Sequence, residues 1–133
     1  MERTLLILKP DAFRRGLVGE IIRRVELKGF KIVNMKFECL SREKAERFYE
    51  EHRGKDFFNK LVNYITSGPI LAIELEGKNA IKMLRILIGA TDPLEREMGS
   101  IRGDFSMDVT ENLVHASDSE ESFKREKRII FEL

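Results

Sequence analysis

The fold is decided by the segment Thr4-Leu5-Leu6-Ile7-Leu8-Lys9, which Pro10 follows directly. The segment contains four consecutive apolar residues with no polar residue between them, so the pattern indicates no solvent-facing side. A short apolar run of this kind is typical of a strand buried on both faces, and the proline favours its end. We therefore predict a strand over residues 4–9 that is buried on both faces.

Outward from this strand, the spacing of apolar residues predicts the other elements. An amphipathic helix is expected from Val18 to the residues before Gly29, which favours a helix end. Residues 32–38 alternate and predict a half-buried strand. Its apolar side carries Val33, Met35 and Phe37. The remaining expected elements are a helix that Ser41 caps, a helix over residues 57–65 ended by Ser67-Gly68-Pro69, a strand over 70–75, a helix from Asn79 to Gly89, a strand over 113–116 and a charged helix over 119–127.

The predicted order of strands and helices is β-α-β-α-α-β-α-β-α. Its core is a β-α-β-β-α-β pattern with an extra helical pair between the second and third strands. Such a pattern predicts a ferredoxin-like α/β (α+β) sandwich, in which a four-stranded antiparallel sheet carries helices on one face. No linker, repeat or low-complexity segment interrupts the chain. We therefore expect a single domain over residues 1–133.

Composition and charge argue against several classes of protein. Apolar residues make up 42% of the chain, enough for a core, and a net charge of +1 does not favour nucleic-acid binding. Sheets of this topology can bind nucleic acid through aromatic residues, but the strands over residues 4–9 and 70–75 carry none. No apolar run exceeds the four residues Leu5–Leu8, so no membrane span is expected. A single cysteine, Cys39, and the lack of a signal-peptide pattern predict a cytoplasmic protein.

Residues 89–112 form a stretch of 24 residues without a clear period. Loops longer than about 12–15 residues are uncommon unless they are functional or disordered. This stretch contains Gly89, Thr91, Pro93 and Arg102 and has no low-complexity composition. It leads directly into the strand over residues 113–116. We therefore expect a structured binding loop that closes over a site on that strand.

The segment Asn112-Leu113-Val114-His115-Ala116-Ser117-Asp118-Ser119 carries one of the two histidines at the end of a predicted strand. Neutral imidazole has a free lone pair near pH 7 and needs no separate base to act as a nucleophile. A histidine held beside hydroxyls and a carboxylate is therefore a candidate for covalent phosphoryl transfer. The alternative is that His115, which follows two apolar residues, is a hydrogen-bonded residue of the core.

A phosphorylated ligand at this histidine would need cations and hydroxyl donors at fixed positions. Candidates are Lys9 at the end of the first strand, Arg85 on the helix that enters the long loop, and Thr91 and Arg102 within that loop. Charged residues make up 35% of the chain, so the alternative for each cation is a solvated surface. Lys9 is the strongest candidate, because it completes an apolar strand.

Aromatic residues offer a second set of candidates. One of Phe57 and Phe58 could stack on a base, although burial in the core is the more common role of phenylalanine and of Tyr49. His52 lies on the same predicted helix face as Tyr49 and could line the mouth of the pocket, but we assign it a surface or helix-end position. Other phosphate and metal chemistries lack their motifs: there is no G-x-x-x-x-G-K-[ST] loop, no H-R-D or D-F-G, and no His and Cys cluster for zinc.

Seven ordered segments match one family. The chain resembles the nucleoside diphosphate kinases over essentially its whole length, and seven matches in order make the resemblance specific. The segments are Glu2-Arg3-Thr4, Lys9-Pro10-Asp11, residues 15–22 (RGLVGEII), residues 28–31 (KGFK), Ser67-Gly68-Pro69, residues 99–105 (GSIRGDF) and residues 112–119 (NLVHASDS). The resemblance favours a catalytic His115 over a core histidine.

The resemblance implies a reversible ping-pong phosphotransferase. A nucleoside triphosphate would give its γ-phosphate to His115, and a nucleoside diphosphate would take it in the same pocket with little base specificity. The implied catalytic residues are His115, acting through Nδ1, Glu126 and Ser117, which fix the ring, and Lys9 and Tyr49 at the transferred phosphate. The implied nucleotide-binding residues are Lys9, Arg85, Thr91 and Arg102 at the phosphates, Asn112 at the ribose, and Phe57 and Val109 on the two faces of the base. Mg²⁺ would arrive on the nucleotide, with no direct ligand from the chain.

Two positions depart from the family pattern. Ala116 stands where glycine often follows the nucleophile, and Met98 stands where proline is common before Gly99. A catalytically impaired nucleotide-binding sensor of the same fold is therefore the alternative function. Family members are typically hexamers or tetramers, so a homo-oligomer is expected. Many relatives carry a longer C-terminal tail that packs on neighbouring subunits, whereas this chain ends at Leu133, which leaves the subunit number open.

Overall fold

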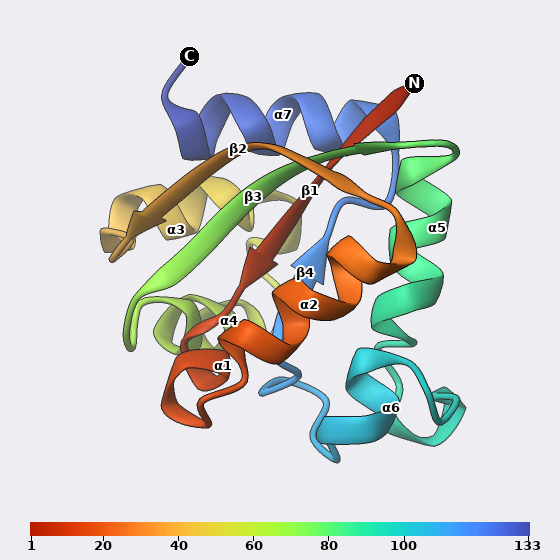
Figure 1. Ribbon diagram of the computed structural model, residues 1–133. Helices are drawn as coiled ribbons and strands as arrows, with labels where there is room; N and C mark the ends of the chain where they lie inside the picture. The colour runs from red at the N-terminus through yellow and green to blue at the C-terminus, as the bar shows by residue number, and fades with distance from the viewer.

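A computed structural model describes residues 1–133 and contains one antiparallel sheet (Figure 1). Its strands are β1 (Glu2–Leu8), β2 (Lys31–Glu38), β3 (Ile70–Gly77) and β4 (Val114–Ala116). They lie in the order β2-β3-β1-β4, and every neighbouring pair is antiparallel. This is the strand order of a β-α-β-β-α-β core, so the predicted ferredoxin-like sheet is confirmed.

The central position of β1 follows from its sequence. Residues Leu5–Leu8 are fully buried, as predicted for a strand covered on both faces. β1 pairs with β3 from Glu2 opposite Gly77 to Leu8 opposite Leu71. On its other edge it pairs with β4, where Ile7 lies opposite His115. The first strand therefore fixes the position of the histidine that the sequence singled out.

The helices connect these strands around both faces of the sheet. They are α1 (Pro10–Arg14), α2 (Val18–Lys28), α3 (Arg42–Phe48), α4 (Phe58–Ile65), α5 (Ala80–Ile88), α6 (Ile101–Phe105) and α7 (Glu120–Phe131), with single 3₁₀ turns at Glu50–His52 and Pro93–Glu95. Predicted helix ends agree with the structure: Gly29 ends α2 with φ 115°, and Ser41 Oγ accepts a hydrogen bond from Lys44 N at 3.1 Å. The short α1 was not predicted. No helix combines the length and apolar composition that crossing a membrane requires.

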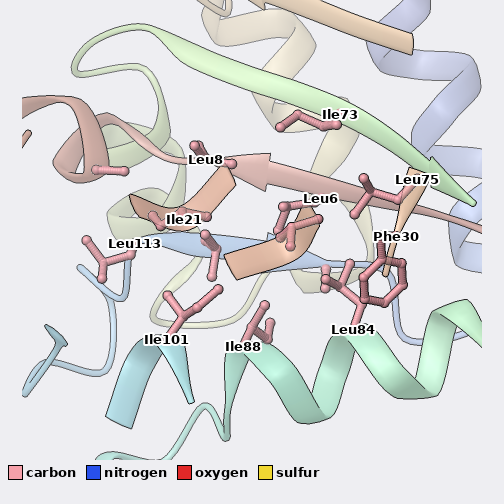
Figure 2. Close-up of a cluster of buried hydrophobic side chains, with 14 of the residues drawn as sticks. Leu6, Leu8, Ile21, Phe30, Ile73, Leu75, Leu84, Ile88, Ile101 and Leu113 are labelled. Carbon is pink, nitrogen blue, oxygen red and sulfur yellow. The ribbon is translucent and has the colours of Figure 1, made fainter. Parts of the chain in front are cut away.

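The prediction that helices cover one face of the sheet is wrong, because they cover both. On one face α2 and α5 pack against side chains such as Leu6 and Leu75, and Figure 2 shows this cluster between the strands and α5. On the other face α3, α4 and α7 pack against Leu5 and Ile7. The extra helical pair between β2 and β3 supplies α3 and α4, so the second layer comes from the insertion that the sequence already indicated.

The strand β2 lies at the edge of the sheet and differs from its prediction. The half-buried side was expected to carry Val33, Met35 and Phe37, but Met35 is 45% exposed and Phe37 is 63% exposed. A break in the β2–β3 register between Ile32 and Asn34 marks a bulge near the start of the strand. The physical reason is that no helix covers this apolar side beyond the edge contact of Phe37 with the ring of Phe13, at 5.7 Å.

The stretch over residues 89–112 is structured, as expected. It contains the 3₁₀ turn at Pro93–Glu95 and the helix α6, whose N-cap Ser100 accepts a hydrogen bond from Gly103 N at 3.0 Å. The stretch begins at Gly89, which ends α5 with φ 92°. It returns to the sheet at β4, so both of its ends lie at the site around His115.

Candidate active site

His115 lies in the middle of β4, with its ring on the face of the sheet covered by α3 and α7. The ring of Phe48 from α3 meets it edge-on, with the ring centroids 5.0 Å apart. His115 Nε2 lies 2.9 Å from Glu126 Oε1 on α7, and Ser117 Oγ donates to the same oxygen at 2.7 Å. The ring is therefore held by contacts from two helices and from the strand that carries it.

These hydrogen bonds assign the tautomer of the ring. Burial alone would raise the pKa of Glu126, but the nearby charge and hydrogen bond of His115 and the hydroxyl of Ser117 bring it below its ordinary value. An ionised carboxylate can only accept, so Nε2 of His115 must carry the hydrogen. In the neutral ring the lone pair is then on Nδ1, which makes no hydrogen bond within the protein. The geometry therefore leaves the lone pair of Nδ1 without a partner in the protein.

The imidazole borders a cavity of about 580 Å³. The cavity is lined by nine residues named from the sequence, from both layers and the long loop: Lys9, Tyr49, Phe57, Arg85, Thr91, Arg102, Val109, Asn112 and His115. Ser117 and Glu126 lie behind the histidine, outside the cavity, and are both buried. The structure thus brings the predicted site residues together from positions that span most of the chain.

Lys9 extends from the end of β1 into the cavity. Its ammonium donates to Asn112 Oδ1 at 3.0 Å and lies 5.7 Å from the centre of the Tyr64 ring. Burial, followed by the positive charge of Arg102, lowers the pKa of Lys9 to about 7, and Asp11 opposes this shift only in part. A cation so desolvated gains more from an incoming anion than one on a solvated surface would.

Arg102 on α6 joins the two ends of the long loop. Its guanidinium donates to the backbone carbonyls of Gly89 at 2.9 Å, Val114 at 2.7 Å and Asn112 at 3.3 Å. Three of its five N–H groups are thereby used, which leaves two for a ligand. Burial, and then the charges of neighbouring arginines, lower the pKa of Arg102 to about 9. Its side chain therefore supports the loop and also contributes positive charge to the cavity.

The other phosphate candidates reach the cavity from its rim. Arg85 on α5 is exposed and donates to the carbonyl of Ala116 at 3.1 Å, beside the histidine. Thr91 is exposed in the loop, three residues after the end of α5. Tyr49 is buried, and its hydroxyl has no hydrogen-bond partner. Burial, followed by the negative charge of Glu126, raises the pKa of Tyr49, so the hydroxyl stays a proton donor that a ligand oxygen can satisfy.

The opposite end of the cavity carries exposed apolar side chains beside His52 and Lys60. Phe57 at the start of α4 is 45% exposed, and Val109 in the loop is 51% exposed. Both line the cavity although neither is buried in the core. Asn112 connects the two ends, because its amide accepts from Lys9 and donates to the carbonyl of Val109 at 3.0 Å. One end of the cavity is thus cationic and the other offers exposed apolar side chains.

A strained turn holds Asn112 in place. Leu113 has φ 76°, a left-handed conformation that is uncommon for a branched side chain, and Val114 N donates across it to Asn112 O at 2.9 Å. The amide of Leu113 donates to Asp11 Oδ2 at 3.1 Å. Asp11 is almost fully buried, and burial raises its pKa against the opposing charge of Lys9. The segment Lys9–Asp11 therefore orders the turn into β4.

Sequence reasoning missed part of the cavity lining. His52 ends the 3₁₀ turn, as the assigned helix-end position predicts, and it also lines the cavity, which the sequence offered as the alternative, with its ring 5.2 Å from that of Phe57. Lys60, Leu61 and Thr110 line the cavity too and were not named. The position of Lys60, three residues after Phe57 on the same helix, was the available signal.

The two departures from the family pattern are accommodated. Ala116 is buried, and its methyl group belongs to the core cluster on the α5 side of the sheet, away from the His115 ring. Met98 is 80% exposed next to Gly99, which has φ 100°. Neither side chain enters the cavity.

Comparison with known proteins decides the family. The family model described as nucleoside diphosphate kinase matches residues 2–133. The chain belongs to the nucleoside diphosphate kinase family. A nucleoside diphosphate kinase of Archaeoglobus fulgidus is 58% identical over 131 residues, covering 98% of this chain and 87% of the relative. That of Fervidobacterium nodosum is 54% identical, covering 98% and 89%.

Solved structures of the family agree with this fold. The nucleoside diphosphate kinase of Halobacterium salinarum, solved in complex with CDP, superposes with a TM-score of 0.95 at 44% identity and covers 99% of this chain and 88% of its own. That of Aquifex aeolicus gives a TM-score of 0.94 at 45% identity, covering 98% and 94%. As a member of the nucleoside diphosphate kinase family, the protein is a phosphotransferase.

Proposed function

We propose that the protein catalyses reversible transfer of a γ-phosphate from a nucleoside triphosphate to a nucleoside diphosphate through phosphorylated His115. The observation that carries the proposal is that Glu126 holds Nε2 of His115 at 2.9 Å while Nδ1 is free beside a cationic cavity. Nδ1 attacks the γ-phosphorus, the bond to the bridging oxygen breaks, and the diphosphate leaves with that electron pair. A second diphosphate attacks the phosphohistidine in reverse, so no water or further reactant is consumed.

The cavity residues would stabilise the charge that this step moves. Lys9 and Arg102 would bind the oxygens of the transferred and bridging phosphates, because both are desolvated cations at the histidine end. Arg85 and Thr91 would bind the outer phosphates from the rim. The free hydroxyl of Tyr49 would donate to a phosphate oxygen. Glu126 and Ser117 would act behind the ring, as groups that orient it.

The apolar end of the cavity would take the base. Phe57 and Val109 would cover its two faces, and Asn112 would contact the ribose. Stacking contributes affinity without reading the edge of a base, so little base specificity is expected. The relative from Halobacterium salinarum was solved in complex with CDP, a pyrimidine nucleoside diphosphate, which supports a nucleoside diphosphate as the ligand.

Magnesium would enter as part of the substrate. The cavity presents lysine and arginine side chains, and no group of three or more His, Cys, Asp or Glu side chains could hold a metal ion. Mg²⁺ characteristically bridges phosphate oxygens and keeps several waters. The chain's own contribution is therefore to bind the phosphates of the Mg²⁺–nucleotide.

The decisive experiment detects the intermediate. Incubation with γ-³²P-ATP and Mg²⁺ is expected to give an acid-labile, base-stable label at His115, and ADP is expected to remove it. The variant His115→Ala is expected to bind ADP but to take no label. A wild-type protein that binds ADP without being labelled would instead support the sensor of the same fold. Label at another residue would overturn the assignment of His115.

Three wider features belong to the same proposal. Residues 1–133 would act as one domain, consistent with a family match over residues 2–133. The exposed apolar side of β2, with Met35 and Phe37, would be covered by a second copy in a homo-oligomer, a tetramer or hexamer. The single, exposed Cys39 suits a reducing compartment, so the cytoplasm is the proposed location.

A further inference from the structure

Arg96 makes an unusual set of contacts in the long loop, although it does not line the cavity. It follows the 3₁₀ turn at Pro93–Glu95 and is half-buried. Its Nε donates to Ala90 O at 2.8 Å and its Nη1 donates to Ser106 O at 2.9 Å. Its Nη2 donates to Thr91 O and to Asp108 O, both at 2.8 Å. Four of its five N–H groups are thus used on backbone carbonyls.

These four carbonyls come from the two arms of the loop. Residues 90–91 form the arm that leaves α5, and residues 106–108 form the arm that leaves α6. The first arm places Thr91 in the cavity, and the second leads directly into Val109. Carbonyls that face a shared guanidinium cannot move apart without losing charge-assisted hydrogen bonds. The Arg96 side chain, which lies outside the cavity, therefore connects the loop arm that carries Thr91 to the arm that carries Val109.

We propose that Arg96 is a positioning residue that fixes the two arms of the loop over the cavity before a nucleotide arrives. The proposal rests on the proposed function only in taking this cavity as the nucleotide site. With the arms already joined, nucleotide binding would not have to order the loop. The complex then avoids the loss of conformational entropy that ordering would cause, and the nucleotide binds more tightly. The chemistry at His115 would not depend on Arg96, because its guanidinium does not line the cavity.

Charge offers a competing explanation that experiment can separate. Arg96 is close enough to Arg102 for its positive charge to contribute to the lowered pKa of that residue. Its field alone could therefore attract phosphates. Lysine keeps the charge but presents a compact ammonium with three donors, which cannot bond in the plane to carbonyls on both arms. The variant Arg96→Lys thus keeps the field and removes the bridge, whereas Arg96→Ala removes both.

The test compares these variants with Arg23→Ala, which removes an equal charge from the exposed side of α2. ADP affinity is measured by titration calorimetry, and the rate of His115 labelling is measured at saturating Mg²⁺–ATP. Both Arg96 variants are expected to lose about ten- to a hundredfold in ADP affinity. Their labelling rate at saturation is expected to stay within about twofold of wild type, since binding and not chemistry is affected. Arg23→Ala is expected to match wild type.

Hydrogen exchange provides the readout that a general loss of stability would not give. In both Arg96 variants the amides of residues 90–92 and 106–111 are expected to exchange faster, while those of β1 and β3 stay protected. If Arg96→Lys binds ADP with wild-type affinity, the positive charge of residue 96 and not its bridge accounts for binding, and the proposal is overturned. Unchanged amide exchange in the two arms of both variants would also overturn it. Should Arg96→Ala not fold, Arg96→Gln removes the charge with a smaller change of shape. Failure of the wild type to label His115 would defeat the proposed function but leave the ADP and exchange tests of Arg96 valid.

Discussion

The orientation of one ring underlies the chemistry at the residue scale. His115 is held by Glu126, and Glu126 is held in turn by Ser117 at 2.7 Å. Sequence resemblance named all three residues, and in the structure they are in contact. What the sequence alone did not contain is the tautomer, because that depends on Glu126 being an ionised acceptor in a buried position.

Replacing Glu126 by glutamine tests this orientation. The amide can donate to Nε2 as well as accept, so the ring loses its fixed tautomer and the charge that stabilises its cationic form. We expect the rate of His115 phosphorylation to fall by about ten- to a hundredfold, the range of loss when the hydrogen-bond partner of a metal-binding histidine is changed. Quench-flow labelling with γ-³²P-ATP measures it. Glu121→Gln, on the exposed start of the same helix, is the control and should be neutral.

The pH dependence of nucleotide binding tests Lys9. Its pKa of about 7 in the free protein lies well below the ordinary value of 10.5, because the ammonium is desolvated. Bound phosphates favour the charged form and raise this pKa, so binding takes up a proton above pH 7. We expect ADP affinity to fall as pH rises from about 7.5 to 9.5, by at most about tenfold per pH unit. Titration calorimetry in buffers of different ionisation enthalpy should record the proton uptake.

A permanently charged variant supplies the comparison for Lys9. Arginine at this position stays protonated at pH 7.5, and so does Arg102 with its pKa of about 9, so Lys9→Arg should lose the proton uptake of the wild type at pH 7.5, whatever its absolute affinity. An affinity of the wild type that is constant between pH 7.5 and 9.5 would show that Lys9 is already charged in the free protein. The position of Lys9 was predictable from its place after an apolar strand, whereas its lowered pKa depends on burial in the folded chain and on the charge of Arg102, which lies far away in the sequence.

At the element scale, the end of α5 illustrates how tightly the loop is joined to the sheet. Gly89 has φ 92°, and a Cβ there would lie 2.5 Å from Ser100 Oγ. Gly99 has a similar φ of 100°, but a Cβ there would meet nothing within 4 Å. An alanine at Gly99 would therefore suffer backbone strain alone, whereas an alanine at Gly89 would suffer backbone strain and a steric clash.

Alanine at these two glycines should have unequal costs. We expect Gly89→Ala to lower the free energy of unfolding by about 2–5 kcal/mol, from strain and overpacking together. Gly99→Ala should cost about 1–3 kcal/mol, from strain alone. Urea denaturation followed by circular dichroism measures both. Equal losses in the two variants would mean that Ser100 moves aside freely and does not fix the loop.

Elements with a long apolar period were predictable, and those set by contacts between distant segments were not. The helix before Gly29 and the cap at Ser41 appear where the sequence placed them. The helix α1 spans only Pro10–Arg14, too few residues to display a period, and its first residue was taken only as the end of a strand. The loop over residues 89–112 is ordered by side-chain bonds to backbone carbonyls, such as those of Arg102, which leave no periodic trace in a sequence.

For the whole molecule, the exposed side of β2 makes a prediction about assembly. Phe37 is 63% exposed on an edge strand whose outer backbone groups have no partner strand. If a second copy covers this side, a carboxylate there would be buried without a counter-charge and would disfavour association. We expect Phe37→Asp to reduce the mass in light scattering to a smaller multiple of 15.5 kDa. Asn34→Asp adds the same charge at an exposed neighbouring position and should leave the mass unchanged. If neither variant reduces the mass, the interface lies elsewhere on the surface.

The burial of β1 between two hydrophobic layers has a consequence for how the protein fails on heating. Leu6 and Leu8 belong to one layer, Leu5 and Ile7 belong to the other, and Lys9 follows directly in the cavity. The backbone at Lys9 cannot leave its position without opening both layers at once, which amounts to complete denaturation. Thermal inactivation and calorimetric melting should therefore coincide in one cooperative transition, with no folded but inactive species between them.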